Sequence, residues 1–357
     1  MHRPRLSLSV LLTTAIIAGG AATATAQDAA PPEAAATANA SGGQGTSEAP
    51  GAAGRAKLPA LGGSDRRPSE TSLRLKGLRN GELTVGKKLV AAGTLRPFVK
   101  DQKVTVLLHR GKRVIERETL KVRPKAKKGS TVGKFSFKKR LIRPGRYSVE
   151  AIHHKNARLG GSKDSTRRFH IRYPDLRQGN SGGAVKVFNR LLADLGYVND
   201  EGGAYDSATG RAVLAFRKVN NMARKSSASV SIFKMLAKGK GGYALKHPGA
   251  GRHVETDLSR QVMVLANGGE VDEIYHISSG APATPTILGK FRFYRKDAGY
   301  NSIGMYYSVY FIRGYATHGY HSVPNYPASH GCLRNPIPDS RHIYNWIDLG
   351  DPIYVYR

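Results

Sequence analysis

The period of the apolar residues changes twice along this 357-residue chain, and that change most limits the folds open to it. Residues 71–173 contain short runs in which apolar and polar residues alternate. Residues 174–222 place apolar residues three and four apart, and residues 252–357 return to alternation. Alternation indicates strands, whereas the spacing of three and four indicates amphipathic helices. We therefore predict a multidomain, mainly β protein with one small helical domain.

The first 26 residues have the three-part layout of an export signal. Arg3 and Arg5 precede an apolar run from Leu6 to Ala18, and the A-x-A pattern of residues 24–26 follows. The apolar run is short for a membrane span. We interpret residues 1–26 as a signal peptide and expect a secreted protein on the cell-wall, extracytoplasmic (periplasmic) side, with no stable membrane span.

Residues 27–70 are rich in Ala, Gly, Pro and Ser and almost lack large apolar residues. Such a composition buries too little apolar surface to offset the entropy lost on ordering. We expect this segment to be a disordered linker.

Residues 71–173 are predicted to form a β-sandwich, because turn signals such as Arg-Asn-Gly and Arg-Pro-Gly-Arg separate its strands. Val104, Val106 and Leu108 are expected to face one side of a strand, and Lys103, Thr105 and Leu107 the other. The pattern resembles, in architecture only, the immunoglobulin-like (Ig-like) modules appended to bacterial surface proteins. The Cys–Trp–Cys signature of antibody domains is absent.

The net charge of +32 is concentrated in this predicted sandwich. Residues 71–173 hold 29 Lys and Arg against 6 Asp and Glu, a net +23, whereas residues 254–357 hold 9 of each. A basic surface favours polyanions and anionic surfaces. For a secreted protein we expect anionic wall polymers, not nucleic acid, as partners, with a general role in solubility as the alternative.

Residues 174–222 are predicted to be a small helical domain in which Gly196 ends the first helix and Asp206 or Ser207 caps the second. The patterns L-x-x-G, V-x-x-x-N-x-x-L-x-x-L-G-Y and Y-D-x-x-T-x-x-A-V-x-x-F resemble the three-helix peptidoglycan-binding module. The resemblance implies glycan binding. It departs at Asn189 and Arg217, where that family usually has glutamine, and a structural spacer is the alternative. Residues 223–251 are interpreted as a linker, either a loop or a hairpin.

The single cysteine, Cys332, lies in the segment PASHGCLRNP. A chain with one cysteine forms no internal disulfide, and a lone thiol in an oxidising compartment is prone to oxidation, so a chemical role is favoured. A thiol becomes a strong nucleophile as thiolate, which a nearby imidazole promotes. His318, His321 and His330 are the candidate partners.

The residues around Cys332 suit acyl chemistry. Gly331 allows close approach of the backbone to a substrate, and the amides of Gly331 and Cys332 are candidate oxyanion donors. Arg334 is suited to bind a carboxylate. A metal site built from the three histidines and the cysteine is the competing interpretation, but the spacing matches no common zinc site. A buried inert cysteine is the third.

The pattern T-H-G at residues 317–319, followed by Y-P-A-S-H-G-C-L-R at 326–334, resembles the signature of YkuD-type L,D-transpeptidases. S-S-G at 278–280 and the T-P segment at 284–291 also resemble that family, and the similarity spans residues 252–357. The resemblance implies a mostly-β catalytic domain with one helix, for which we expect residues 339–349. It implies the following roles: Cys332 as nucleophile, His318 as base oriented through the carbonyl of Gly319, Ser329, His330 and Gly331 around the oxyanion, and Arg334 and Tyr326 as substrate contacts.

The activity implied by the resemblance is acyl transfer through a Cys332 thioester. D-alanine leaves a peptidoglycan stem peptide, and the amine of a second stem completes a 3-3 cross-link. The implied partners are peptidoglycan stem peptides and glycan, and the implied reaction needs no cofactor. We expect the protein to be a monomer. Two alternatives remain open: an L,D-carboxypeptidase, in which water replaces the amine, and a non-catalytic wall-binding scaffold.

Overall fold

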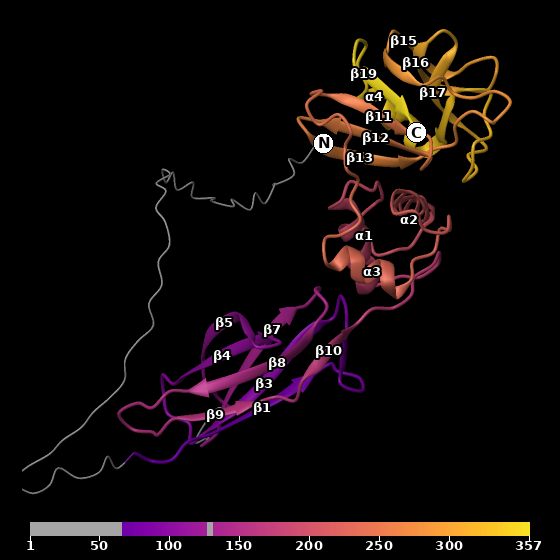
Figure 1. Cartoon of the computed structure of the whole chain (residues 1–357). Coiled ribbons are helices and arrows are strands. Elements are labelled where there is room, and N and C mark those ends of the chain that lie inside the picture. Colours follow the sequence, from indigo (N-terminus) through magenta and orange to yellow (C-terminus); the bar gives the residue numbers. More distant parts are fainter. Residues whose placement is uncertain (1–65, 127–130) are drawn as a thin grey trace, which may run out of the picture. The chain divides into compact units, whose positions relative to one another are not determined.

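The computed structural model describes residues 66–126 and 131–357 (Figure 1). The predicted signal peptide and residues 27–65 of the predicted linker lie outside the described residues. The end of that linker is already part of a sheet: Arg67 bridges to Leu159, and the first strand begins at Glu70. No helix in the described part of the chain is both long enough and apolar enough to cross a bilayer.

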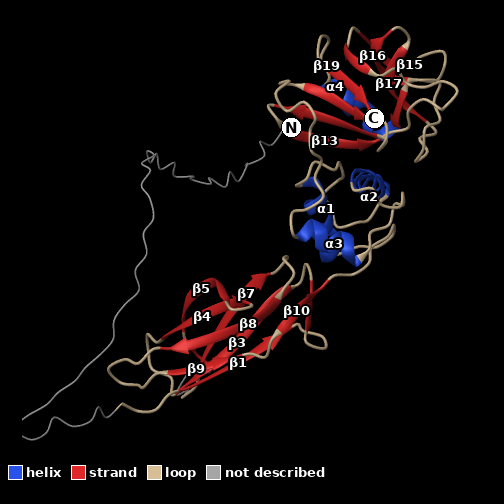
Figure 2. Cartoon of the chain, viewed as in Figure 1, coloured by secondary structure: helices blue, strands red, loops and turns tan. Residues whose placement is uncertain are grey.

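Two sheets form the N-terminal part, and Figure 2 shows it without helices. The first sheet has the order β1 (Glu70–Lys76), β3 (Lys88–Arg96), β7 (Gly133–Arg140), β6 (Arg123–Pro124). The second has the order β2 (Glu82–Thr84), β10 (Phe169–Arg172), β8 (Arg146–His153), β4 (Lys103–Arg110), β5 (Arg113–Lys121), with β9 (Ser162–Ser165) beside β8.

Inward residues of both sheets share one core, as alternation predicts. Val104, Val106 and Leu108 of β4 are fully buried and belong to the same cluster as Phe135 and Phe137 of β7. Each of the two phenylalanines alternates with exposed polar neighbours. The mainly β prediction is thus confirmed here, while the Ig-like assignment stays a prediction.

Three helices follow, α1 (Gly183–Ala193), α2 (Ser207–Val219) and α3 (Val230–Ala237). The Asp206 carboxylate accepts the Thr209 N–H at 2.9 Å, so the predicted cap of α2 is confirmed. Helix α3 lies within residues 223–251, for which the sequence predicts a linker. It forms because Ile232, Phe233 and Leu236 are buried, and Phe233 packs edge-on against Phe188 of α1 with ring centroids 5.1 Å apart.

The C-terminal part contains two further sheets. One has the order β13 (Glu270–His276), β12 (Val262–Asn267), β11 (His253–Asp257), β19 (Pro352–Tyr356), β14 (Gly289–Arg292). The other has the order β15 (Arg295–Tyr300), β16 (Tyr306–Ile312), β17 (Tyr315–Tyr320), β18 (Leu333–Pro336). Gly268 and Gly269 both have positive φ in the β12–β13 turn, as the predicted Asn-Gly-Gly hairpin requires.

The single helix of this part, α4 (Ile337–Trp346), begins and ends earlier than the predicted 339–349. Pro338 occupies the first turn, where its missing N–H costs no hydrogen bond. The helix packs on β16, β17 and β18, and Ile343 joins the core of the domain. It therefore fixes the strands that carry the candidate site.

Candidate active site

Cys332 and His318 belong to one small region of a single sheet. Strands β17 and β18 pair in parallel, with His318 directly opposite Arg334. Cys332 immediately precedes β18, two residues before Arg334. Because side chains alternate between the two faces of a strand, Cys332, His318 and Arg334 are directed to the same face of the sheet.

The opposite face of these strands is closed by packing and hydrogen bonds. Leu333 is fully buried in the domain core. The Asn335 amide donates to Thr317 Oγ1 at 3.0 Å and its oxygen accepts from Ser340 Oγ of α4 at 2.6 Å. The register of the two strands is therefore held from behind, which fixes the residues on the reactive face.

His318 is a buried, neutral imidazole with a defined tautomer. It is only 3 % exposed, and its Nδ1 lies 2.9 Å from the carbonyl oxygen of Gly319. A carbonyl oxygen only accepts, so Nδ1 carries the proton and Nε2 carries the free lone pair. Burial lowers the pKa of His318 to about 4, and the charge of Arg334 acts in the same direction. At neutral pH the ring can accept a proton at Nε2.

The Cys332 side chain is half-buried and protonated at rest. Burial raises the pKa of its thiol, although the backbone of Ala316 and the charge of Arg334 act against that rise. The thiol donates to the Gly314 carbonyl at 3.8 Å and also has a hydrogen bond with the backbone of Ala316. The resting pair is thus a neutral thiol and a neutral imidazole without a direct hydrogen bond. The thiolate expected from the sequence is not the resting form, because burial disfavours both charges.

Ser329 folds the loop in front of Cys332 into a tight turn. Its hydroxyl donates to the Cys332 carbonyl at 2.5 Å and accepts the Gly331 N–H at 3.0 Å. The Gly331 amide is therefore engaged by Ser329, and its role near the oxyanion stays a prediction. The Cys332 N–H donates to no acceptor among the described residues, so it is the amide left for that purpose.

Two glycines of the site are required by close contacts. Gly331 has φ +112°, and a Cβ there would lie 2.0 Å from Cε1 of Tyr315. A Cβ on Gly319 would lie 2.2 Å from Ser340 Oγ of α4. Both positions exclude every other residue type. At Gly331 the reason is backbone conformation together with the Tyr315 contact, and at Gly319 it is the contact with α4.

Arg334 presents a guanidinium without a carboxylate partner among the described residues. Its backbone is fixed by two hydrogen bonds with Ser278, in which each residue donates its N–H to the other's carbonyl, at 2.9 and 3.0 Å. Its side chain stacks over the Tyr320 ring with the guanidinium carbon 4.2 Å from the centroid. The group is oriented and remains available to an anion.

The other predicted residues are less closely placed. His330 is exposed. Tyr326 is 59 % exposed, and its carbonyl, not its side chain, accepts a hydrogen bond from Ser278 Oγ at 2.7 Å. His321 is exposed and lies against Tyr320. Within residues 66–126 and 131–357, no cluster of three His, Cys, Asp or Glu side chains suits a metal ion.

Sequence reasoning missed Lys218 of α2. This lysine is only 2 % exposed, and its Nζ donates to the carbonyls of Gln261 at 3.0 Å and Ile277 at 2.9 Å and to Nδ1 of His276 at 3.1 Å. Burial lowers its pKa well below the usual value. In the sequence it follows Arg217 and looks like part of a solvated helix face, so no local signal marks it.

Two arginines of the helical part also contact the catalytic part. Arg211 of α2 holds Asp339 of α4 through two hydrogen bonds, at 3.0 and 2.9 Å. Arg224 donates to the Asn325 carbonyl at 2.5 Å, within the loop that leads to Cys332. Helices α1–α3 and the candidate site are therefore joined by specific polar contacts.

Comparison with known proteins identifies this part of the chain. Residues 251–355 match the family model of the YkuD L,D-transpeptidase catalytic domain. The solved L,D-transpeptidase of Xylanimonas cellulosilytica is 29% identical over 51% of this chain and 98% of its own, with a TM-score of 0.48. The enzyme of Stackebrandtia nassauensis is 20% identical over 51% and 95%, with a TM-score of 0.33.

An L,D-transpeptidase from Mycobacterium smegmatis is 13% identical over 82% of this chain and 100% of its own, with a TM-score of 0.28. The search of curated proteins finds no match. The family match covers the segment that contains Cys332, His318 and Arg334. Residues 251–355 are therefore an L,D-transpeptidase catalytic domain of the YkuD family.

Proposed function

We propose that the protein is an exported cysteine L,D-transpeptidase that forms 3-3 cross-links in peptidoglycan, with Cys332 as its nucleophile. One observation carries the proposal: His318 of β17 pairs with Arg334 of β18, and Cys332 lies two residues before Arg334. Alternation along the strand then puts the three side chains on one face. The Nδ1–H of His318 is held by Gly319, so Nε2 is the basic nitrogen. L,D-transpeptidase domains act on peptidoglycan, which lies outside the cytoplasm.

The first step is attack by sulfur on the donor stem. The thiol proton passes to Nε2 of His318 as the sulfur bonds to the carbonyl carbon between the third residue and D-alanine. A general base is needed because the thiol is protonated at rest. We expect substrate binding to bring the Cys332 thiol and the His318 ring into hydrogen-bond contact, because catalytic hydrogen bonds often form only in the complex.

The second step is collapse of the tetrahedral intermediate. Its oxyanion accepts a hydrogen bond from the Cys332 N–H, which has no other acceptor among the described residues. The C–N bond to D-alanine breaks, the leaving amine takes the proton from the His318 imidazolium, and a thioester remains.

Transfer to the acceptor completes the cycle. The side-chain amine of a second stem attacks the thioester carbon, gives its proton to Nε2 of His318 and releases the Cys332 sulfur, which is then reprotonated. Arg334 holds a carboxylate of the stem peptide, since its guanidinium is oriented by Tyr320 and faces the same side as the thiol. Contacts of Tyr326 and His330 with the substrate stay predictions.

The roles of the other domains stay predictions as well. Helices α1–α3 are proposed to bind glycan, but the two departures from the peptidoglycan-binding pattern have structural partners. The Asn189 amide is buried and donates to the carbonyls of Gly202 and Ala204 at 3.0 and 3.1 Å. Arg217 donates to the Ser227 carbonyl at 2.9 Å. Both side chains support the helices themselves.

The test combines a covalent probe with purified stems. A carbapenem should add its mass to the intact wild-type protein and not to Cys332→Ala, and His318→Gln should slow the addition. With tetrapeptide stems, mass spectrometry should show a cross-linked dimer and free D-alanine. Tripeptide without dimer would identify the L,D-carboxypeptidase instead. Cross-linking that survives Cys332→Ala would overturn the proposal in favour of a scaffold.

A further inference from the structure

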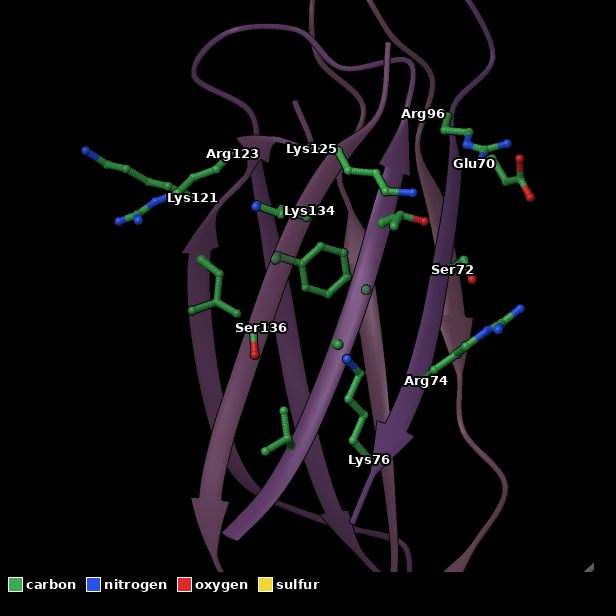
Figure 3. Close-up of a pocket in the computed structure, with 16 residues that line it drawn as sticks. Glu70, Ser72, Arg74, Lys76, Arg96, Lys121, Arg123, Lys125, Lys134 and Ser136 are labelled. Atoms are coloured by element: carbon green, nitrogen blue, oxygen red, sulfur yellow. The ribbon is translucent and has the colours of Figure 1, made fainter. Parts of the chain in front are cut away.

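A cationic groove lies on the outer face of the sheet β1-β3-β7-β6, in the N-terminal part of the chain (Figure 3). Its volume is about 1090 Å³. Seven Lys and Arg residues and one carboxylate, Glu70, line it; the cations are Arg74, Lys76, Arg96, Lys121, Arg123, Lys125 and Lys134. The charge of the domain is thus gathered around one concave surface.

Strand register explains why this face is hollow. Ser72, Thr94, Lys134 and Arg123 form one row across the four strands, and Arg74, Ala92 and Ser136 form the next. Small residues such as Ala92, Thr94 and Ser136 occupy much of the inner strands β3 and β7, which also carry Arg96 and Lys134. The other cations lie on β1, β5 and β6 or just after β6. Figure 3 shows Arg74 and Lys76 on one side of Ser136, with Lys121 and Arg123 on the other.

None of the seven cations forms an ion pair with a described carboxylate. In the same domain, Lys139 does pair with Glu116, at 2.5 Å, on a different surface. A cluster of like charges without partners raises its own electrostatic energy, which a bound anion relieves. The arrangement therefore favours an anionic ligand over a purely structural role.

We propose that this groove binds a single, extended anionic polymer whose repeating unit carries phosphate. The strand segment from Glu70 to Lys76 gives the groove a length of about 20 Å, enough for several repeats in line. Cations on both sides suit charges along a chain, and hydroxyls such as those of Ser72 and Thr94 donate to phosphate oxygens. For a wall-facing protein, the matching class of partner is a phosphate-containing wall polymer.

The shape of the groove argues against two other anionic partners. A bilayer is a broad surface, whereas here the cations surround a hollow. Single-stranded nucleic acid needs aromatic platforms for its bases. The one aromatic lining residue, Phe135, is only 5 % exposed and packs over Gly93.

The experiment compares two triple variants of the mature protein by fluorescence titration. The groove variant carries Arg74→Gln, Arg123→Gln and Lys134→Gln. The control carries Lys103→Gln, Arg113→Gln and Lys163→Gln, three exposed positions on the other sheet, so the change in net charge is the same. The probes are long-chain inorganic polyphosphate, poly(glycerol phosphate), polyglutamate and vesicles of phosphatidylglycerol.

We expect the groove variant to lose affinity for both phosphate polymers by roughly fivefold per cation, about a hundredfold in all. In a plot of log K against log salt concentration, the magnitude of the slope for the groove variant should decrease by about 2, and the control should stay near wild type. Cys332→Ala should bind as wild type does, which separates this site from the proposed catalysis.

Equal losses in the two triple variants would overturn the proposal, because binding would then follow net charge alone. So would tighter binding to vesicles or polyglutamate than to the phosphate polymers. Matching thermal unfolding midpoints in the two variants would show that both are folded, since exposed substitutions of this kind change stability little.

Discussion

The side-chain nitrogen of Lys218 lies 3.0 Å from the main-chain oxygen of Gln261. The side-chain amide of Gln261 in turn holds Ser279 at both its ends, accepting the Ser279 N–H at 2.9 Å and donating to its Oγ at 2.6 Å. The Ser279 carbonyl accepts the N–H of Ser329 at 2.9 Å. A buried lysine on a helix is thus connected through two residues to the loop that positions Cys332.

Replacing Lys218 with methionine tests this connection. The change keeps the bulk but removes the donor to the carbonyls of Gln261 and Ile277 and to His276, of which Gln261 keeps the Ile277 N–H at 3.1 Å. We therefore expect a loss of about 3 kcal/mol in the free energy of unfolding. Urea denaturation measures it, and carbapenem acylation well below the unfolding midpoint should also be slower. Lys234→Met, at an exposed position of α3, is the control and should change little. Equal behaviour of the two variants would contradict the connection.

The pH dependence of acylation should report on His318. Because burial lowers the pKa of His318 to about 4, the base stays unprotonated down to about that pH. We expect kcat/KM for acylation to hold through the mildly acidic range and then to fall about tenfold per pH unit below pH 4. A stopped-flow pH profile measures it. An acid limb near pH 6.5, the value of a free imidazole, would show that the ring is solvated in the working enzyme.

Gly331→Ala should abolish acylation. The new methyl group would lie 2.0 Å from Cε1 of Tyr315, and φ of +112° is strained for alanine. Strain and overpacking together should lower the free energy of unfolding by about 2–4 kcal/mol. Gly249→Ala is a suitable control, because a Cβ there meets no atom within 4 Å. Full activity in the Gly331 variant would mean that the loop has another accessible conformation.

Arg334→Gln should act on substrate binding and on the thiol. Loss of a charged hydrogen-bond donor should raise KM for stem peptides with a free carboxylate by roughly tenfold to a hundredfold. The Arg334 charge also lowers the pKa of Cys332, so the variant should have a still higher thiol pKa, measurable by pH-dependent alkylation. Arg341→Gln, on the exposed face of α4, should leave both values unchanged. An unaltered KM in the Arg334 variant would assign carboxylate binding elsewhere.

The features that could be predicted from sequence depend on neighbours along the chain. Local conformation and the spacing of apolar residues, every two in a strand or every 3.6 in a helix, predict three features. These are the helix cap at Asp206, the turn at Gly268 and Gly269, and the inward face of β4. The residues of the candidate site could be predicted from a short sequence signature, because they are close in sequence or lie on one pair of neighbouring strands.

The features that could not be predicted depend on tertiary contacts. Helix α3 is eight residues long, in a segment rich in Lys, Ser and Gly, and its burial depends on packing of Phe233 against α1. Lys218 finds its three acceptors only across the contact with the catalytic part. The neutral state of the Cys332 thiol follows from burial, which no motif records.

The contact of α2 with β12 and β13 has a consequence for how such a protein can be rearranged. Val262, Val264 and Ile274 of the catalytic part belong to the same apolar cluster as the helices. A chain cut to begin at residue 252 would expose this patch to water and deprive Asp339 of its arginine. If such domains are recombined in evolution, helices α1–α3 and the catalytic sheets would therefore have to be inherited together as one unit.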